Sequence, residues 1–364
     1  MAQAPSFKRL TDRISARTID EAEVVASVLL AILVAHAMGA TNVSWAAFAG
    51  YMVMRGHAAE TVLRGVLRIL GTIAGGLLAL AVSPLLGSPF AAALALFLVG
   101  SGALYAALTA RRSYAWLFLG LTFAMVVLDR IEHPGIAARD FVETRILETV
   151  AGTLACVAVS LASTFTLRRR WPATRSPRPV SLGWHPEAFR HALQAGVALA
   201  VLVALAAWLH VPALAQSAIG IMAVMIVPAD AIGASGLGPV SRRLLHRFIG
   251  CLAGAAIAAV FLFLAQGRAP LLILGTILGV VLGRHLENGD PRHRYVGTQL
   301  ALAILIALVP DSYADAAIEP ALTRLAGVLI GIAVLEPVLL AWHALAPRRP
   351  AQTAAEDRGE IGGI

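Results

Sequence analysis

The chain carries little charge and almost no cysteine. Of its 364 residues only 14% are charged, whereas 59% are hydrophobic and the mean hydropathy is +0.78. A soluble domain of this length needs far more charge to cover its surface, so these values predict a membrane protein. The two cysteines, Cys156 and Cys251, each lie inside an apolar run. They argue against a disulfide framework or a cysteine metal site and are expected to be small core residues.

The motifs of the common enzyme classes are also missing. The sequence has no GxSxG elbow, no HExxH pair, no Walker-type phosphate loop, no CxxC pair and no glycine-rich dinucleotide turn. We therefore expect no catalytic residue, no cofactor and no metal, and the protein is not predicted to be an enzyme. Without a nucleotide site, primary active transport by this chain alone is not expected either.

Apolar runs between charged or proline-bearing breaks give twelve candidate membrane spans. The first six runs cover residues 24–39, 43–54, 69–86, 90–110, 114–128 and 146–166, and the second six cover 192–209, 214–227, 248–265, 271–282, 295–309 and 325–345. Several are shorter than the ~18–20 residues that cross a ~30 Å hydrocarbon core. Two alternatives therefore stay open: the short helices are sheltered inside the bundle, or the chain crosses ten times and has re-entrant segments. That prediction is an all-α polytopic membrane protein with about twelve transmembrane helices.

The net charge of +8 is a topology signal. The arginines are spread over short loops between apolar runs instead of forming one basic face, which argues against a nucleic-acid partner. With the N-terminus inside and twelve crossings, the inner segments hold 24 of the 29 Lys and Arg residues. Because cytoplasmic loops carry the excess of Lys and Arg, both termini are predicted to be cytoplasmic.

One short pattern occurs four times. The segments RILGTIAG, RILETVAG, RFIGCLAG and RLAGVLIG begin at Arg68, Arg145, Arg247 and Arg324. The first two arginines are 77 residues apart, the last two are again 77 apart, and each second-half copy follows its counterpart by 179 residues. These equal offsets predict a tandem duplication of a six-helix unit. Within each unit the two copies start from opposite membrane sides, which suggests a nested inverted repeat of three plus three helices.

The duplication sets the expected domain boundaries. Residues 1–20 form a cytoplasmic arm, in which Phe7, Leu10 and Ile14 share one helical face, and residues 21–167 form the first six-helix unit. An Arg- and Pro-rich cytoplasmic linker follows at 168–190, then the second unit at 191–346. The polar segment 347–364 is expected to be a disordered cytoplasmic tail.

The repeated glycines and arginines have different expected roles. Small residues at i and i+4 let another helix backbone approach closely, so we expect helix packing at Gly71, Gly75, Gly152, Gly250, Gly254, Gly327 and Gly331. The four arginines stand at the heads of the predicted runs and allow two interpretations. In one, they reach the lipid headgroups and anchor helix ends, as is also expected of Arg64, Arg111, Arg242 and Arg243.

In the other interpretation, the same four arginines face the bundle interior beside helix N-termini, two near each membrane face. They would then form an electropositive lining suited to a carboxylate, with Arg68, Arg145, Arg247 and Arg324 as substrate-binding residues. Two carboxylates inside apolar runs, Glu148 and Glu336, are candidates for proton coupling, because a charge at membrane depth is costly by about 2.5 kcal/mol or more. Glu148 also has Arg145 three residues before it as a candidate ion-pair partner.

The helix-three signatures RGVLRILGTIAGG and RRLLHRFIGCLAGAA, with the sixth-helix signature ETRILETVAG, resemble the fusaric acid resistance-like superfamily. This superfamily includes bacterial aromatic acid exporters and is related to the plant aluminium-activated malate transporters. The family signature falls on Arg68, Gly71, Gly75, Arg145, Gly152, Arg247, Gly250, Gly254 and Arg324. The linker at 167–189 is shorter than the large cytosolic domain of many bacterial members, which puts regulation through such a domain in doubt.

The resemblance implies a multi-pass protein of the bacterial inner membrane that exports aromatic or other hydrophobic organic acids. Its implied partners are small organic anions and the lipid bilayer, with a periplasmic adaptor and a homo-oligomer as further candidates. The leading hypothesis is a secondary transporter coupled to protons through Glu148 or Glu336. The alternatives are an organic-anion channel of the same fold and a non-transporting membrane scaffold or assembly protein.

Overall fold

The computed structural model describes residues 15–173, 184–209, 211–228, 231–232 and 235–345, and this part of the chain is helical with no strand. The first half contains α2 (Ala16–Ala37), α3 (Val43–Val53), α4 (Ala58–Val82), the 3₁₀ turn η1 (Ser83–Leu85), α5 (Pro89–Thr109), α6 (Ser113–Glu132) and α7 (Ala138–Phe165). The four-residue α8 (Leu167–Arg170) follows. The second half contains α9 (Pro186–Leu209), α10 (Leu214–Val224), α11 (Leu237–Ala265), α12 (Ala269–Glu287), α13 (Arg294–Leu308), η3 (Tyr313–Asp315) and α14 (Glu319–Leu345).

The all-helical membrane class is confirmed. Each of the twelve predicted apolar runs falls in a helix, and eight helices within the described ranges are long and apolar enough to cross a membrane: α4, α5, α6, α7, α9, α11, α12 and α14. The helices α3 and α10 have only 11 residues each, and α13 has 15. At ~1.5 Å per residue, 11 residues reach only about half of the hydrocarbon core. Twelve full crossings, the duplication and the cytoplasmic termini therefore stay predictions.

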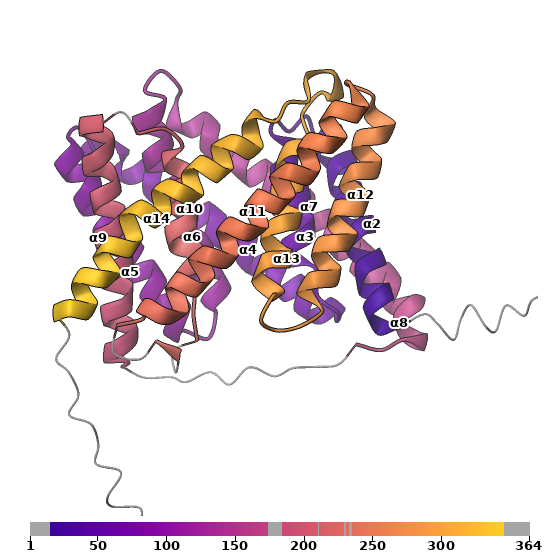
Figure 1. Cartoon of the computed structure of the whole chain (residues 1–364), viewed down its shortest axis with the longest axis horizontal. Coiled ribbons are helices and arrows are strands. Elements are labelled where there is room, and N and C mark those ends of the chain that lie inside the picture. Colours follow the sequence, from indigo (N-terminus) through magenta and orange to yellow (C-terminus); the bar gives the residue numbers. More distant parts are fainter. Residues whose placement is uncertain (1–14, 174–183, 210, 229–230, 233–234, 346–364) are drawn as a thin grey trace, which may run out of the picture.

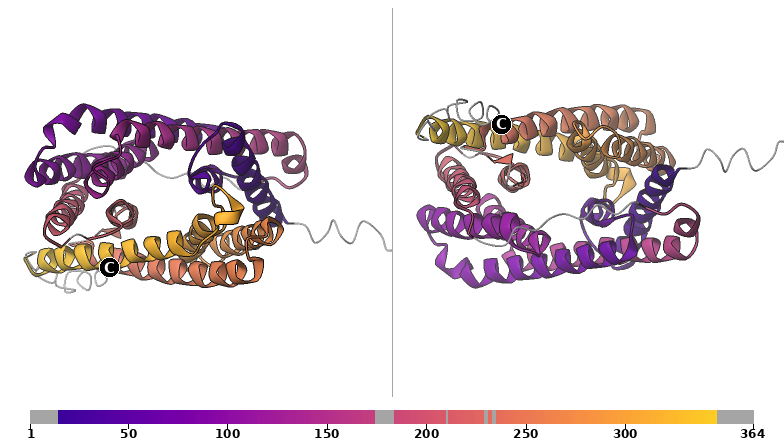
Figure 2. Two further views of the ribbon diagram at one scale, coloured as in Figure 1. Left: turned by 90° about the horizontal axis from the view of Figure 1, so that it is seen from above. Right: turned by 90° about the horizontal axis from the view of Figure 1, so that it is seen from below.

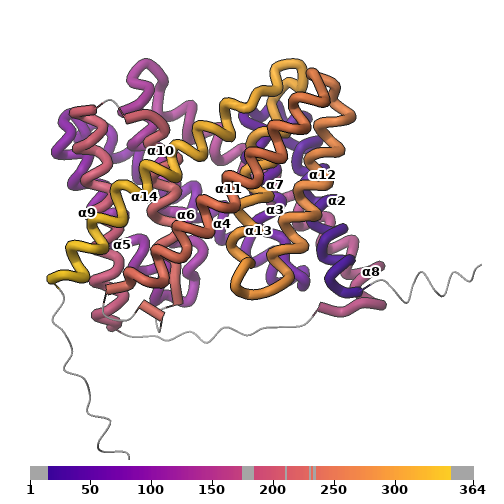
Figure 3. Tube along the Cα trace, viewed as in Figure 1, coloured from indigo at the N-terminus to yellow at the C-terminus, as the bar shows by residue number. Residues whose placement is uncertain are grey.

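The short helices lie between two long walls (Figures 1 and 2). One wall contains α4 and α7, and the opposite wall contains α11 and α14, which cross the view as long tilted helices in Figure 3. Between the walls α6 contacts α10, and α3 contacts α13. The outer ends are closed where α5 packs on α9 and where α2 packs on α12. These contacts form matched pairs between the halves: α6 with α10 corresponds to α13 with α3, and α5 with α9 corresponds to α12 with α2.

The two ends of the bundle differ. The start of α2, the end of α8, the start of α9 and the end of α14 all lie at one end, the lower end in Figure 1, which we call the terminal end. At the opposite end, the far end, each half caps a short helix of the other. Asp311 accepts a hydrogen bond from the Val43 backbone N–H (2.7 Å), and Glu132 accepts bonds from the backbone N–H groups of Ala213 (2.7 Å) and Leu214 (3.1 Å).

These two carboxylates are 179 residues apart, which is the offset of the repeat. Each binds the unsatisfied N–H groups at a helix start, where a negative charge also meets the positive end of the helix dipole. Both carboxylates therefore join the two halves of the bundle. Both cysteines are buried and free, and the predictions for residues 1–14 and 347–364 lie outside the described residues.

Candidate functional site

A cavity of about 1470 Å³ lies between the two walls, and all four repeat arginines line it. Its lining runs toward the terminal end, where it includes Arg111, Pro291 and Arg292 of the loops there. None of the residues in the far-end loops 133–137, 266–268 and 309–318 lines it. The cavity therefore extends from the arginines toward the end of the bundle at which α2 starts and α14 ends.

The expectation that the arginines stand at helix heads is wrong. Arg68 and Arg247 each lie ten residues inside their helices, α4 and α11, because the charged lead-in before each apolar run is itself helical. The field of a helix terminus is confined to its first turn, so the helix dipoles add nothing at these positions. The charges are instead accommodated by the cavity, and Arg68, Arg247 and Arg324 expose only 3%, 1% and 1% of their surface.

In the second half two arginines converge on one amide. The Gln299 side chain of α13 accepts a hydrogen bond from Arg247 Nη1 (3.0 Å) and another from Arg324 Nη2 (2.9 Å) at the same oxygen, Oε1. Arg247 Nη1 also lies 3.4 Å from the Tyr295 hydroxyl. Because both guanidinium groups contact one atom, Arg247 and Arg324 form a pair. The prediction that they lie near opposite membrane faces is therefore wrong.

The first half has different partners. Arg68 donates to the Tyr114 hydroxyl of α6 (3.4 Å) and lies over the Phe118 ring, 4.1 Å from its centroid. Arg145 forms an ion pair with Glu148 (Nη1–Oε2 3.2 Å) and lies 3.9 Å from the centroid of the Trp45 ring. Trp45 thereby lines the cavity.

The two halves match in position and differ in chemistry. Tyr114 and Tyr295 occupy corresponding places, each as the second residue of its helix, α6 or α13. Each hydroxyl lies beside a repeat arginine, and each ring also contacts a second arginine, one helical turn before that repeat arginine. That second arginine is Arg64 over Tyr114 (3.8 Å) and Arg243 over Tyr295 (4.3 Å). Four residues after each tyrosine the first half has Phe118 and the second half has Gln299. At this position the first half therefore has an apolar ring where the second half has an amide.

The cavity is strongly basic. Twelve arginines line it but only three glutamates, among the residues that the structure describes. The arginines expected to reach lipid headgroups are part of this excess, because Arg64, Arg111, Arg242 and Arg243 all line the cavity. Sequence reasoning missed them because a basic residue just before an apolar run also fits a headgroup anchor.

The two candidate carboxylates lie in different places. Glu148 is 1% exposed, lines the cavity and has Arg145 as its ion-pair partner. Glu336 of α14 lies outside the cavity, in a small groove between α11 and α14, where it accepts a hydrogen bond from the Ser241 hydroxyl (2.6 Å). Only Glu148 shares a site with the repeat arginines. Within the described part of the chain, no cluster of three His, Cys, Asp or Glu side chains is arranged to hold a metal ion.

The repeated glycines lie where helices pack most closely. A Cβ built on Gly75 would stand 2.4 Å from the Leu119 carbonyl oxygen of α6, and one on Gly254 would stand 2.6 Å from the Leu300 carbonyl oxygen of α13. Close contacts of the same kind bring α4 onto α6, α11 onto α13, α7 onto α3 and α14 onto α10, through Gly71, Gly75, Gly250, Gly254, Gly152, Gly327 and Gly331. The tyrosine-bearing helices are thereby held against the arginine-bearing helices.

We expect Gly75→Ala to destabilise the protein by about 1–3 kcal/mol, because the added methyl group meets a backbone carbonyl that cannot move alone. Thermal unfolding of the purified protein in detergent measures the change. Gly102→Ala on α5 is the matched control, since a Cβ at that exposed position meets no atom within 4 Å. An equal loss of stability in both variants would contradict close packing at Gly75.

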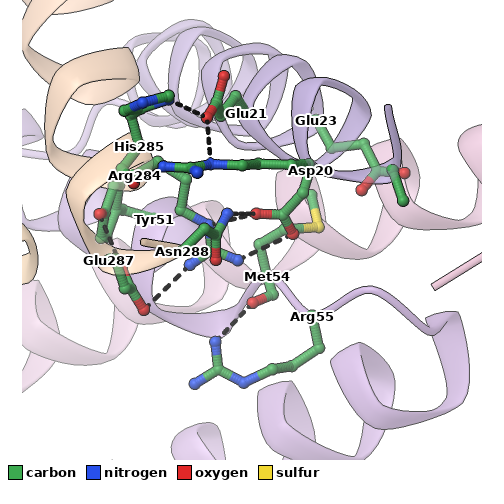
Figure 4. Close-up of polar contacts among 12 residues, drawn as sticks. Asp20, Glu21, Glu23, Tyr51, Met54, Arg55, Arg284, His285, Glu287 and Asn288 are labelled. Carbon is green, nitrogen blue, oxygen red and sulfur yellow. Dashed lines mark hydrogen bonds and ion pairs between the residues drawn. The ribbon is translucent and has the colours of Figure 1, made fainter. Parts of the chain in front are cut away.

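Charged residues also join the halves at the edge of the cavity, where α2 meets α12 (Figure 4). Arg284 of α12 binds both carboxylate oxygens of Asp20 on α2, at 2.6 and 3.0 Å, and Asn288 donates to the same carboxylate (2.6 Å). Glu287 pairs with Arg284 (3.2 Å) and accepts a hydrogen bond from Tyr51 of α3 (2.8 Å). This cluster fixes one edge of the cavity, whose lining includes Tyr51, Arg284 and Glu287.

The comparisons with known proteins agree with the signatures found in the sequence. A family model described as fusaric acid resistance protein-like matches residues 30–159 and 231–335. No curated protein and no solved structure matches the chain. The matched segments contain all four repeat arginines and the three cavity tyrosines Tyr51, Tyr114 and Tyr295, and they cover more than half of the 364 residues. On this match, the chain belongs to the fusaric acid resistance protein-like family.

Proposed function

We propose that this protein is a secondary transporter that exports hydrophobic organic anions, aromatic acids among them, across the bacterial inner membrane. The observation that carries the proposal is the placement of four repeat arginines on one cavity, three of them almost completely buried. Only one carboxylate, Glu148, forms an ion pair with any of the four in the described structure. The site therefore has positive charge in excess of its own counter-charges.

Such an excess favours an anionic ligand. A buried guanidinium group without a counter-charge is destabilising by several kcal/mol, and a carboxylate that enters the cavity removes part of this cost. Guanidinium groups also bind carboxylates through paired N–H···O bonds. The cavity wall beside the arginines contains the rings of Trp45, Phe48 and Phe118, which suit an apolar or aromatic body attached to the carboxylate. A scaffold protein needs no such basic cavity, which favours transport over that alternative.

The direction of transport is proposed from the topology. The lining reaches the terminal end, which the excess of Lys and Arg in the intervening loops assigns to the cytoplasm. A substrate would then enter from the cytoplasmic side while the reciprocal caps of Glu132 and Asp311 hold the far end together. Release to the outside requires the two halves to separate at that end. Alternating access in related architectures works by such movement of one helical unit against the other.

Glu148 is the residue through which we propose proton coupling. Its carboxylate and an incoming substrate carboxylate would compete for the same guanidinium group, Arg145. Because two anions at one guanidinium repel each other, protonation of Glu148 would accompany substrate binding. The reverse step, loss of the proton and release of the anion, would then restore the ion pair. The proton and the anion would therefore cross together, and the outward concentration gradient of the substrate would drive export.

The test is transport of radiolabelled benzoate by the purified protein in liposomes. A transporter coupled to protons speeds the initial uptake of benzoate above the passive rate, and an imposed pH gradient raises that protein-dependent rate, whereas an anion channel gains no rate from the pH gradient. Protein-free liposomes measure the passive flux of the neutral acid. Uptake no faster than in protein-free liposomes, for benzoate and for a panel of other organic acids, would rule out the proposed function.

A further inference from the structure

The repeat arginines of the two halves bury different numbers of unpartnered guanidinium nitrogens. The second-half pair has four buried nitrogens without a hydrogen-bond partner, Nε and Nη2 of Arg247 and Nε and Nη1 of Arg324. In the first half the corresponding atoms are only Nε of Arg68 and Nε of Arg145. All four side chains line the same cavity, but they are buried to different extents: the Arg145 side chain is 12% exposed, whereas Arg247 and Arg324 expose 1% each.

The partners of the two pairs also differ in charge. Arg145 has a carboxylate, Glu148, and Arg68 has both the Tyr114 hydroxyl and the face of Phe118. Arg247 and Arg324 share a neutral amide oxygen, which accepts hydrogen bonds but supplies no negative charge. Two guanidinium groups at one neutral oxygen repel each other, and a buried pair of like charges is destabilising unless a counter-charge joins it.

We infer that the two halves of the cavity bind different parts of the substrate, and that the substrate's carboxylate binds between Arg247 and Arg324. The two unused Nη groups, one from each arginine, are donors for the two oxygens of one carboxylate. Gln299 is a positioning residue, because its Oε1 accepts one N–H from each arginine and so fixes both guanidinium groups. The apolar body of the substrate then lies toward the first half, against Trp45 and Phe118. This inference rests on the proposed function.

Equivalent arginines should therefore respond differently to the same change. We expect Arg247→Gln and Arg324→Gln to raise the KM for benzoate in liposomes by about tenfold or more, because each removes a charged hydrogen bond to the carboxylate. Arg68→Gln removes the equivalent charge from the first half, and we expect a rise of about threefold or less. Equal effects of Arg68→Gln and Arg247→Gln would overturn the inference while leaving the transport function intact.

The Gln299→Glu variant separates a positioning role from a structural one. The new carboxylate would neutralise the arginine pair, so we expect a higher melting temperature together with loss of benzoate binding. Benzoate should raise the melting temperature of the wild-type protein, since a ligand that binds only the folded state stabilises it. That shift should disappear in Gln299→Glu. A variant that is less stable and still shifted by benzoate would overturn the role given to Gln299.

Phe118→Gln, the exchange at the corresponding first-half position, is the matched variant. It leaves the Arg247 and Arg324 pair unchanged, so the melting temperature should still rise with benzoate, although at higher concentrations because an apolar contact is lost. If Phe118→Gln abolished the shift and Gln299→Glu kept it, the carboxylate would bind in the first half. If the wild-type protein transports none of the tested carboxylates into liposomes and none of them shifts its melting temperature, the proposed function fails and the inference fails with it.

Discussion

Glu148→Gln should abolish the protein-dependent uptake of benzoate that a pH gradient drives and leave its downhill exchange in place. Glutamine keeps the size of the side chain and removes the group that takes up and releases a proton. The carboxylate is 1% exposed, and among the described residues it forms an ion pair with Arg145 alone, at 3.2 Å. Without it, Arg145 no longer has a protein carboxylate that competes with the substrate. We expect the protein-dependent initial rate of benzoate uptake under an imposed pH gradient to fall about tenfold or more, toward the rate of protein-free liposomes.

The exchange reaction shows whether the variant still binds its substrate. Liposomes loaded with unlabelled benzoate should take up labelled benzoate through Glu148→Gln at a rate close to that of the wild type, since exchange needs no net proton movement. Glu336→Gln is the control, because Glu336 bonds Ser241 in a groove between α11 and α14 and does not line the cavity. Loss of this pH-driven uptake in Glu336→Gln with retention in Glu148→Gln would assign the coupling to Glu336.

Much of the fold follows from the sequence because the apolar runs dominate this chain. Every predicted run falls in a helix, since a segment in lipid must satisfy its backbone hydrogen bonds internally. The ends of the runs were less predictable. The charged lead-in of α4 is helical from Ala58, whereas the predicted run begins at Ile69, because hydropathy does not register a polar helical segment that faces a basic cavity.

The spacing of the arginines and glycines in the sequence indicates which way the arginine side chains face. Arg247, Gly250 and Gly254 stand at positions i, i+3 and i+7, so they share one helix face. The glycines mark the face that packs on another helix, and this face places Arg247 toward α13 and the bundle interior. Gln299 carried no comparable signal. A lone glutamine inside an apolar run contacts Arg247 and Arg324 only through the tertiary packing of α13 against α11 and α14.

Asp20→Ala should be among the most destabilising single changes on the cavity edge. Its carboxylate accepts two hydrogen bonds from Arg284 and one from Asn288, and Arg168 lies 3.7 Å away. The Arg284 side chain is only 5% exposed, so removal of Asp20 leaves a buried cation with Glu287 as its remaining carboxylate partner. Breaking a buried ion pair from one side costs about 3–5 kcal/mol. We expect a loss of that size in the free energy of unfolding in detergent.

The adjacent carboxylate provides the matched control. Glu21 pairs with Arg17 and His285, whose side chains are 36% and 57% exposed, and exposed pairs contribute about 0–1 kcal/mol. Glu21→Ala should therefore unfold close to the wild type, although it removes the same charge from the same helix turn. A double-mutant cycle of Asp20→Ala with Arg284→Met measures the coupling between the two side chains directly. Because this pair joins α2 of the first half to α12 of the second, a coupling near zero would mean that the other contacts between these two helices hold them together.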